Sequence, residues 1–216
     1  MTADWMRDER PRLAAERILD VAAQLYAANG IAAVGMAEVA RAAGCSRATL
    51  YRYFDGRQAL QLAFVQREAR RIGALVADSV VVGDPKNTVV GDPKNTVVGD
   101  PKNTVVGDPK VMVVDAMLTA IRLVRADPTL TAWFQLGDSG LAAQIAHSSG
   151  VIESLGAAFL GRSRFTGEET ARRARWLVRI IVSLLTVPGI DDADERTMLE
   201  QFVAPVLAAP IGAERP

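Results

Sequence analysis

The segment at residues 36–60, MAEVARAAGCSRATLYRYFDGRQAL, restricts the fold of this chain more than any other part of it. Its first half places apolar residues at i, i+3, i+4 and i+7, the spacing of one helical face: Met36, Val39, Ala40 and Ala43. Gly44 follows where such a helix has to stop, because glycine adopts a left-handed turn without steric cost. The pattern therefore predicts a short helix that ends in a glycine turn.

A second short helix is predicted directly after this turn. Ser46 stands at its N-cap position, where the hydroxyl can accept a hydrogen bond from a free backbone N–H group. Leu50 and Phe54 face inward at i, i+4, which leaves the side chains with donor groups on the other sides: Arg47, Thr49, Tyr51, Arg52 and Tyr53. Two short helices joined by a tight turn, the second rich in donors, are typical of a helix-turn-helix, whose second helix enters the major groove of DNA.

This part of the chain resembles the DNA-binding domain of the TetR family of bacterial transcriptional regulators. The residues that carry the resemblance span about fifty positions in the right order: Ile18-Leu19-Asp20-Val21-Ala22-Ala23, Leu25-Tyr26, Asn29-Gly30, Val39-Ala40, Ala43-Gly44, Ser46, Thr49-Leu50-Tyr51, Tyr53-Phe54 and Ala59-Leu60. The resemblance implies an all-α protein. Its N-terminal three-helix helix-turn-helix domain binds DNA, and a C-terminal helical domain binds a ligand and forms the dimer.

Charge is unevenly placed along a chain whose formal net charge is zero. Between residues 41 and 71, seven arginines stand against Asp55 and Glu68, so this stretch carries 7 − 2 = +5. A basic stretch that coincides with a helix-turn-helix is the electrostatic footprint of a DNA reader. The alternative interpretation is that these arginines only form a solvent-exposed helix face, which is what a run of charges usually indicates.

Four parts are predicted along the chain. We expect a flexible tail at 1–10 and a DNA-binding domain at 11–72, with the helix-turn-helix at about 35–54. A helical regulatory and dimerisation domain follows at 73–80 and 111–210, interrupted by a repeat loop at 81–110.

Helices are predicted at about 11–28, stopped by Asn29-Gly30, and from the cap Asp55 to about 79, with Gln58 completing a capping box. Further helices are expected at 111–126, at a short segment that begins after Asp127-Pro128, and at 151–160, with a weak helical pattern at 141–145. The last two are expected from the capping box Thr166–Glu169 to 187 and at 193–207. In the last helix we expect a kink at Pro205 and an inward face made of Met198, Leu199, Phe202, Val203 and Val206.

Residues 81–110 repeat the unit VVGDPKNT, in full from Val81, Val89 and Val97 and truncated from Val105 to Lys110. Asp-Pro-Lys-Asn suits a type I turn, and proline withholds one donor per unit from any sheet. We expect a mobile surface loop, with a small ladder of hairpins or a solenoid as the alternatives. Its lysines and aspartates cancel, and lengthening a loop costs little entropy, so we expect the array to be nearly neutral for DNA binding.

By resemblance, the second helix of the motif is the recognition helix. Arg47 and Thr49 stand where base contacts are expected, since an arginine fork suits guanine, while Tyr51, Tyr53 and Arg57 reach phosphates. Arg52 suits either partner. Thr49 could instead bond its own helix, and Tyr53 could pack its ring on the first helix. The family usually places threonine or serine where Gly35 stands, so capping by Gly35 is weaker, although its amide could contact phosphate. The full set of expected DNA-contacting residues is Gly35, Met36, Ala37, Arg47, Ala48, Thr49, Tyr51, Arg52, Tyr53 and Arg57.

The resemblance also implies partners for the second domain. A small apolar or aromatic effector is expected among its helices, in a pocket lined by Leu75, Met117, Ile121, Trp133, Phe134, Leu155, Phe159 and Trp176. Each of these residues could equally be plain core. A homodimer is expected through helices at about 168–187 and 193–207, which would present two reading heads to double-stranded operator DNA. His147 could anchor a ligand but is more typical of an exposed loop.

Other functions find little material in the sequence. With one histidine and one cysteine there is no ligand set for a histidine-cluster metal site, and no nucleophile–base pair or phosphate loop is evident, so we expect no enzyme and no cofactor. Cys45 is expected to pack in the turn as a small hydrophobe. No signal segment or membrane span is predicted, and a cytoplasmic protein is expected. The alternative to a ligand-responsive repressor is a DNA-binding architectural or protein-interaction protein of the same fold.

Overall fold

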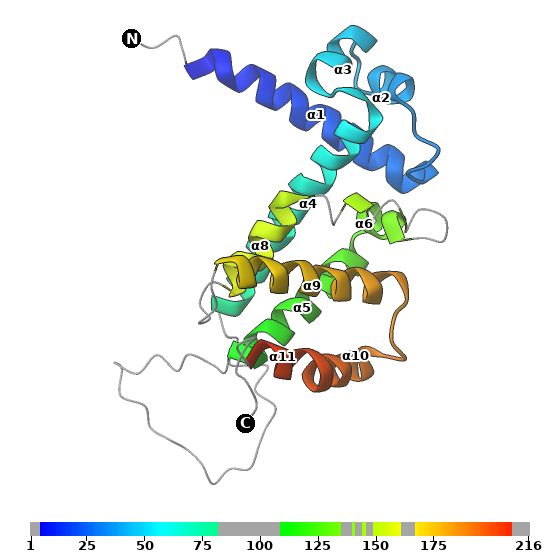
Figure 1. Ribbon diagram of the computed structural model, residues 1–216. Helices are drawn as coiled ribbons and strands as arrows, with labels where there is room; N and C mark the ends of the chain where they lie inside the picture. The colour runs from blue at the N-terminus through cyan, green and yellow to red at the C-terminus, as the bar shows by residue number, and fades with distance from the viewer. Residues whose placement is uncertain are drawn as a thin grey trace.

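The computed structural model describes residues 5–81, 109–134, 140, 144–145, 149–160 and 167–208. All regular elements in these residues are helices, which confirms the all-α prediction: α1 (Trp5–Asn29), α2 (Met36–Ala42), α3 (Arg47–Tyr53), α4 (Gly56–Val81), α5 (Pro109–Ala126), α6 (Pro128–Thr131), η2 (Ala132–Phe134), α8 (Gly150–Leu160), α9 (Gly167–Thr186), α10 (Asp192–Met198), η3 (Leu199–Val203) and α11 (Ala204–Ala208). Figure 1 shows α1, α2 and α3 at one end of the molecule, with α4 running from them to the remaining helices.

The first hydrophobic core holds α1 to α4 together and continues into the second domain. Leu50 of α3 and Ala22 of α1 are fully buried in it. At its far side three aromatic rings meet. Tyr26 of α1 and Phe64 of α4 pack edge to face with centroids 5.6 Å apart. Trp133 of η2 lies edge to face on Tyr26 at 5.5 Å and stacks on Phe64 at 5.6 Å. This aromatic cluster therefore joins the helix-turn-helix end of the molecule to the second domain.

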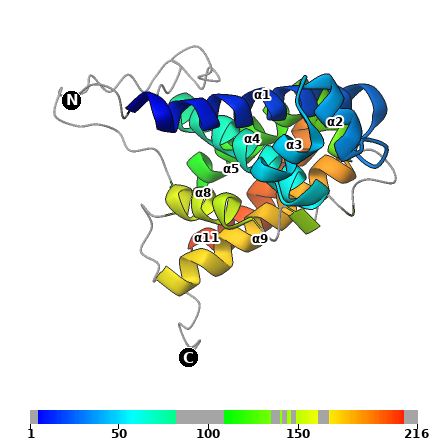
Figure 2. The same cartoon turned by 90° about the horizontal axis from the view of Figure 1, so that it is seen from above.

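The second core lies among α5, α8, α9 and the C-terminal helices. Viewed from above, α8 and α9 lie side by side (Figure 2). Arg173 of α9 is buried, pairs with Glu169 at 2.7 Å and donates to the carbonyl of Val206. Arg125 of α5 makes two hydrogen bonds, of 2.6 and 2.9 Å, with the buried carboxylate of Glu195. These charged contacts attach the C-terminal helices to α9 and α5.

Several predicted helix ends are confirmed. Gly30 and Gly44 have φ values of 77° and 68°, in the left-handed region, directly after α1 and α2. The Oδ1 atom of Asp127 caps α6 by accepting from the backbone N–H of Thr129 at 3.0 Å. Residues 5–10, which we expected in a flexible tail, belong to α1. Pro11 lies inside that helix, near its N-terminal end. Because proline has no backbone N–H, one helical hydrogen bond is missing there.

The C-terminal helix departs from the predicted pattern just before Pro205. Residues Leu199–Val203 form a π-helix directly before the proline at which a kink was expected. A wider turn at this point is a recognised way to accommodate a residue that clashes with the carbonyl four positions back. Leu199 and Val203 face the core as predicted, but Phe202 and Val206 do not, being 63% and 44% exposed. They lie one turn apart on a face that no other described part of the chain covers.

The repeat array is mostly outside the described residues. Val81 is the last residue of α4, and Pro109 and Lys110 are the first two of α5, so the array is helical at both of its ends. The cap at Thr166, the candidate anchor His147 and most of the weak pattern at 141–145 also lie outside the described residues.

Candidate nucleic-acid interface and ligand cavity

The outer face of α3 is free of the core. Arg47, Ala48 and Arg52 are exposed, and Tyr51 is 52% exposed. Leu50 and Phe54 are buried on the opposite face, as predicted. The remaining donors, Thr49 and Tyr53, are half-buried. The guanidinium of Arg52 lies 5.4 Å from the centroid of the Tyr53 ring. The side chains of α3 that the sequence predicts to contact DNA are therefore exposed or half-buried, on the side away from the core.

Ser46 caps α3 through its hydroxyl, which confirms the prediction. Its Oγ accepts from the backbone N–H of Thr49 at 3.0 Å and lies 2.9 Å from the Thr49 hydroxyl. The contact between the two hydroxyls holds the Thr49 side chain against its own helix cap, at the first turn of α3. Gly35 caps α2 with no side-chain hydrogen bond, and its carbonyl accepts from the N–H groups of Glu38 and Val39, both at 3.1 Å. Met36 is half-buried and Ala37 exposed beside it.

Arg57 has partners that the sequence did not suggest. Its Nη2 donates to the carbonyl oxygens of Ile31 and Ala32, at 2.8 and 2.9 Å. Those residues belong to the loop between α1 and α2, and Ile31 is fully buried. The guanidinium remains exposed, so it holds the loop from the outside. A phosphate contact by Arg57 stays a prediction, while the contact with the loop is a feature of this fold.

The basic stretch divides into two groups once it is folded. Arg67 bonds Asp20 and Glu16 of α1 at 2.7 and 3.3 Å, and Arg71 bonds Asp127 at 2.5 Å. These arginines are matched by carboxylates and add little positive field. Of the other five arginines, Arg70 is exposed further along α4, and the four within residues 36–57 stand against Glu38 and Asp55, a local charge of 4 − 2 = +2. The positive charge at the helix-turn-helix is therefore smaller than the +5 counted along the sequence.

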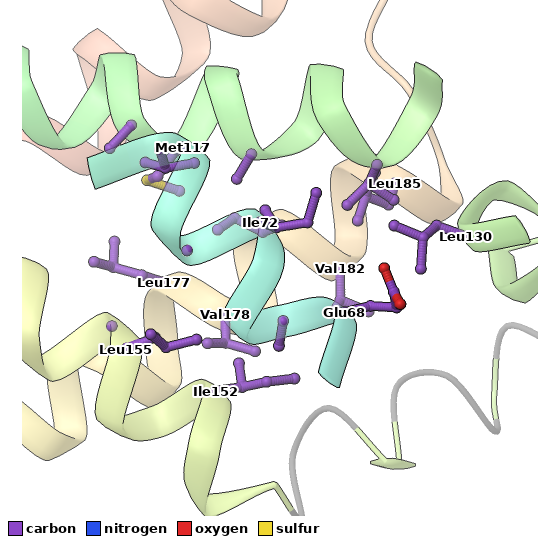
Figure 3. A pocket seen from close by; sticks show the side chains of 18 of the residues that line it. Glu68, Ile72, Met117, Leu130, Ile152, Leu155, Leu177, Val178, Val182 and Leu185 are labelled. Atoms are coloured by element: carbon purple, nitrogen blue, oxygen red, sulfur yellow. The ribbon is translucent and has the colours of Figure 1, made fainter. Parts of the chain in front are cut away.

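A cavity of about 230 Å³ lies among α4, α5, α8 and α9 (Figure 3). Its wall is almost wholly aliphatic and aromatic, and the residues labelled in the figure are Glu68, Ile72, Met117, Leu130, Ile152, Leu155, Leu177, Val178, Val182 and Leu185. Among the described residues that line it, Glu68 alone carries a charge. Such a space suits an apolar small molecule, since ligand cavities are typically apolar with a few placed polar groups.

The predicted pocket residues divide between the cavity wall and other places. Met117, Trp133, Phe134 and Leu155 line the cavity. Three others do not lie on its wall. Leu75 is 43% exposed on the outer side of α4, Ile121 is buried in the second core, and Trp176 packs against that core from α9. A helical periodicity identifies apolar residues but not which side of a buried helix meets a cavity, which explains these three. The side chain of Phe159 is outside the described part.

Glu68 was not predicted to have a role, although it is the polar feature of the cavity. Its side chain is 10% exposed. Oε1 accepts from Nε of Arg67 at 3.0 Å, and Oε2 accepts from Nε of Arg71 at 2.6 Å. Because these arginines also bond α1 and Asp127, Glu68 sits at the centre of an ion-pair network, here called the α4 network: Glu16, Asp20, Arg67, Glu68, Arg71 and Asp127.

Trp133 contributes a second polar atom near the cavity. Its side chain is buried, and its Nε1 has no hydrogen-bond partner among the described residues. The neighbouring Tyr26 is also buried, and this loss of solvation raises the pKa of its hydroxyl to about 12, against a smaller opposing effect of Arg57. Tyr26 is therefore neutral at physiological pH and acts here as an aromatic packing group.

Two negative findings concern the described residues. Within them, no group of three or more His, Cys, Asp or Glu side chains is placed to hold a metal ion. No helix in the part of the chain that the structure describes is both long and apolar enough to cross a membrane.

Cys45 is a free thiol, half-buried and packed against the first core, as expected for a small apolar residue.

Comparison with known proteins agrees with this geometry. Over 214 residues the chain is 41% identical to the HTH-type transcriptional regulator Rv1255c of Mycobacterium tuberculosis, covering 98% of this chain and 94% of that protein. Residues 18–64 match the family model for bacterial regulatory proteins of the tetR family. A helix-turn-helix on an all-helical frame, with a relative this similar along its whole length, defines a DNA-binding transcription regulator. The chain belongs to the tetR family of bacterial regulatory proteins.

Solved structures show the same fold at lower sequence identity. The TetR family repressor AlkX from Dietzia sp., implicated in biodegradation of n-alkanes, superposes with a TM-score of 0.60 at 22% identity, covering 89% of this chain and 94% of AlkX. RolR in complex with resorcinol gives 0.62 at 16% identity, with 95% and 98% covered. FadR from Bacillus subtilis in complex with stearoyl-CoA gives 0.52 at 14%, with 91% and 99% covered.

Proposed function

We propose that this regulator is a homodimeric repressor that reads operator DNA with α3 and leaves it when an apolar small molecule fills the cavity. The observation that carries the proposal is the pairing of two separate features in one chain. One is an exposed recognition face with Arg47 and Tyr51 outward, and the other is an aliphatic cavity between α4, α5, α8 and α9. AlkX, RolR and FadR, which share the fold, are linked to alkanes, resorcinol and stearoyl-CoA, so this architecture is compatible with apolar and aromatic effectors.

The C-terminal helices support the dimer. Phe202 and Val206 present an apolar face to solvent, and the outer side of α9 runs through Arg172, Arg175 and Arg179. Large exposed apolar side chains that share a face are typical of an interface with a second subunit. Two-fold pairing through this region would place two α3 helices for successive major grooves, which doubles the contact that one short helix can make.

Operator binding is tested with substitutions on α3. We expect Arg47→Ala to cost on the order of 1–3 kcal/mol per half-site and to relax base preference, because an arginine fork reads guanine edges. Tyr53→Phe removes one hydroxyl and should weaken all sequences similarly. Affinities are measured by fluorescence anisotropy on a fragment selected from the DNA upstream of the protein's own coding sequence. Arg122→Ala, an exposed arginine on α5, is the matched control. Parent-like binding by both α3 variants would falsify α3 as the reader.

Effector release is tested on the protein–operator complex. A ligand that binds only the folded protein raises its thermal midpoint, so apolar compounds are first screened by thermal shift. Compounds that stabilise the protein are then added to the operator complex, and we expect them to dissociate it. Stabilisation without dissociation would leave a DNA-binding protein with a cavity but no switch. The absence of any stabilising compound would favour an architectural protein of the same fold.

A further inference from the structure

We infer that the effector is a neutral, mostly apolar molecule carrying one hydrogen-bond donor, such as an alcohol or a phenol, and that the carboxylate of Glu68 receives this donor. The inference rests on the proposed ligand function of the cavity and specifies the chemical class of its occupant. Among the described residues of the wall, Glu68 is the one charged group on an otherwise apolar surface. In Figure 3 its carboxylate stands at the edge of the labelled aliphatic side chains, beside Leu130.

The carboxylate has acceptor capacity to spare. An ionised carboxyl group offers about four lone-pair positions and no donor. Two of these positions are used, one by Nε of Arg67 on Oε1 and one by Nε of Arg71 on Oε2. The two guanidiniums fix the orientation of the carboxylate, so the remaining lone pairs have defined directions. A ligand with a donor group can therefore hydrogen-bond to this oriented carboxylate. A hydrogen bond to an ionised acceptor is stronger than one between two neutral groups.

Charge selects a neutral donor over a charged one. A second cation at Glu68 would face the guanidiniums of Arg67 and Arg71, which lie 3.0 and 2.6 Å from the same carboxylate. It would also lose its hydration to an aliphatic wall, which is costly for an ion. Glu68 is the one charged residue on the described wall, so an anionic ligand meets a like charge there and also loses its hydration. A hydroxyl group gives the hydrogen bond without either penalty.

Size follows from the volume of the cavity. A cavity of roughly 150 Å³ with an apolar lining takes one benzene ring. The cavity here has about 230 Å³, so it suits a ligand of roughly nine non-hydrogen atoms. Substituted benzenes of that size are convenient probes, because one atom can be exchanged while shape and volume are kept.

The experiment compares matched probes on the full-length protein by isothermal titration calorimetry. The probes are 4-ethylphenol, which donates, 4-methylanisole, which only accepts, 4-ethyltoluene, which does neither, and 4-methylbenzylammonium, which donates but is charged. We expect 4-ethylphenol to bind at least tenfold more tightly than each of the other three. The anisole is the decisive comparison, because the unpaired Nε1 of Trp133 would favour an acceptor instead of a donor.

Variants assign the preference to Glu68. Glu68→Gln should reduce the ratio between 4-ethylphenol and 4-ethyltoluene at least fivefold, since an amide oxygen is a weaker acceptor than a carboxylate. Glu16→Gln is the matched control and should keep the parent ratio. It makes the same change in a carboxylate that also bonds Arg67, at 3.3 Å, but does not line the cavity. Should Glu68→Gln fail to fold, the comparison of phenol and anisole on the parent protein still decides.

The outcomes separate this inference from the proposed function. Equal binding of the three neutral probes, or tighter binding of the anisole, overturns the role of Glu68 while leaving an effector cavity in place. Binding of none of them overturns the inference, while the screen for stabilising compounds still decides the proposed function. A phenol preference that depends on Glu68 without release of operator DNA supports the ligand class and contradicts the repressor mechanism.

Discussion

One guanidinium secures the loop that leads into the helix-turn-helix. Arg57, at the start of α4, donates through Nη2 to the carbonyls of Ile31 and Ala32, at 2.8 and 2.9 Å. Both carbonyls lie in the loop after α1, whose own helical bonding ends with Gly30. The loop continues into Gly35, the backbone cap of α2. Arg57 therefore positions α2 through the backbone, which is a role separate from any contact with phosphate.

Arg57→Lys distinguishes these two roles. Lysine keeps the charge that a phosphate contact needs, but its shorter side chain does not bring a donor to the position of Nη2, which bonds both carbonyls. We expect the variant to lose about 1 kcal/mol of folding stability, as for one hydrogen bond to a charged group at an exposed position. Urea unfolding measures this loss, with Arg41→Lys, an exposed arginine on α2, as the control. Unchanged stability would show that the loop contact contributes nothing.

At the residue scale, local chemistry was predictable and distant partners were not. The cap by Ser46 and the turns at Gly30 and Gly44 follow from neighbours within a few positions, and the structure confirms them. The partners of Arg57 lie 25 and 26 positions away, and Glu16 lies 51 positions from Arg67. Charge counted along the sequence treated Arg67 and Arg71 as free cations, because ion pairing is decided only when α4 packs on α1 and α6.

At the element scale, two glycines set how closely the helices around the cavity approach. A Cβ added at Gly73 of α4 would lie 2.9 Å from Cδ2 of Leu155 on α8. A Cβ at Gly156 would lie 3.1 Å from the Cβ of Ala174 on α9. The absence of side chains at these points lets α4, α8 and α9 come together while Gly73, Leu155 and Gly156 all remain on the cavity wall.

Gly73→Ala should reduce ligand binding with little change in stability. Alanine gains about 1 kcal/mol of helix propensity, which offsets the displacement of the flexible end of Leu155. The displaced Leu155 occupies space in the cavity, so we expect at least fivefold weaker binding of any stabilising ligand. Calorimetry and urea unfolding measure the two effects. Gly150→Ala is the control, because nothing lies within 4 Å of its added Cβ. Parent-like affinity in Gly73→Ala would mean that Leu155 moves away from the ligand.

The junction of α5 with α10 is predicted to depend on pH. Hydrogen bonds from Arg125 hold the pKa of the Glu195 carboxyl below its usual 4.5, with a further contribution from the Gly189 N–H and despite the opposing effect of burial. A depressed pKa stabilises the fold at pH values above the unfolded pKa, and this contribution is lost as pH falls through the folded pKa. The contribution of Glu195 should therefore be complete at neutral pH and decline below about pH 4.5.

Glu195→Gln tests this dependence. We expect it to cost on the order of 3 kcal/mol at pH 7, because Arg125 loses the partner of a largely buried ion pair. The difference between parent and variant should shrink as the pH is lowered below the usual range of the carboxyl. Urea unfolding at a series of pH values measures it. Glu200→Gln, at an exposed carboxylate paired with Arg196, should have a small effect. A difference that stayed constant with pH would contradict the assignment.

Helix positions were predictable from periodicity and caps, but the inner face of the last helix was not. Phe202 lies outward within the π-helix that precedes Pro205, on a face that no described part of the chain covers. Apolar character alone cannot tell a side chain buried within a chain from one that meets a second subunit. Nor can apolar character tell which side of a helix meets a cavity, so Leu75 and Trp176 do not line it.

At the scale of the whole molecule, the α4 network and the aromatic cluster connect the cavity wall to α1 of the helix-turn-helix domain. Glu68 bonds Arg67, and Arg67 bonds Asp20 and Glu16 on α1. Beside it, Trp133 lines the cavity and also packs on Tyr26 of α1. A change at Glu68 or Trp133 therefore reaches α1 within one or two contacts. None of these links could be predicted from sequence, since each depends on how α4 crosses α1.

Arg67→Gln should uncouple the ligand from DNA. The variant removes the charged link between Glu68 and α1 but leaves α3 and the apolar wall unchanged. We expect operator affinity within threefold of the parent and ligand affinity only moderately altered, because neither site loses a direct contact. The ligand concentration needed for half-release of operator should rise at least tenfold, since allosteric coupling is typically a factor of roughly 5 to 150. Anisotropy titrations of the operator complex measure it. Arg70→Gln, the exposed neighbour on α4, is the control and should release like the parent. If Arg67→Gln also releases like the parent, the coupling runs through Trp133 and Tyr26, and Tyr26→Leu should then impair it.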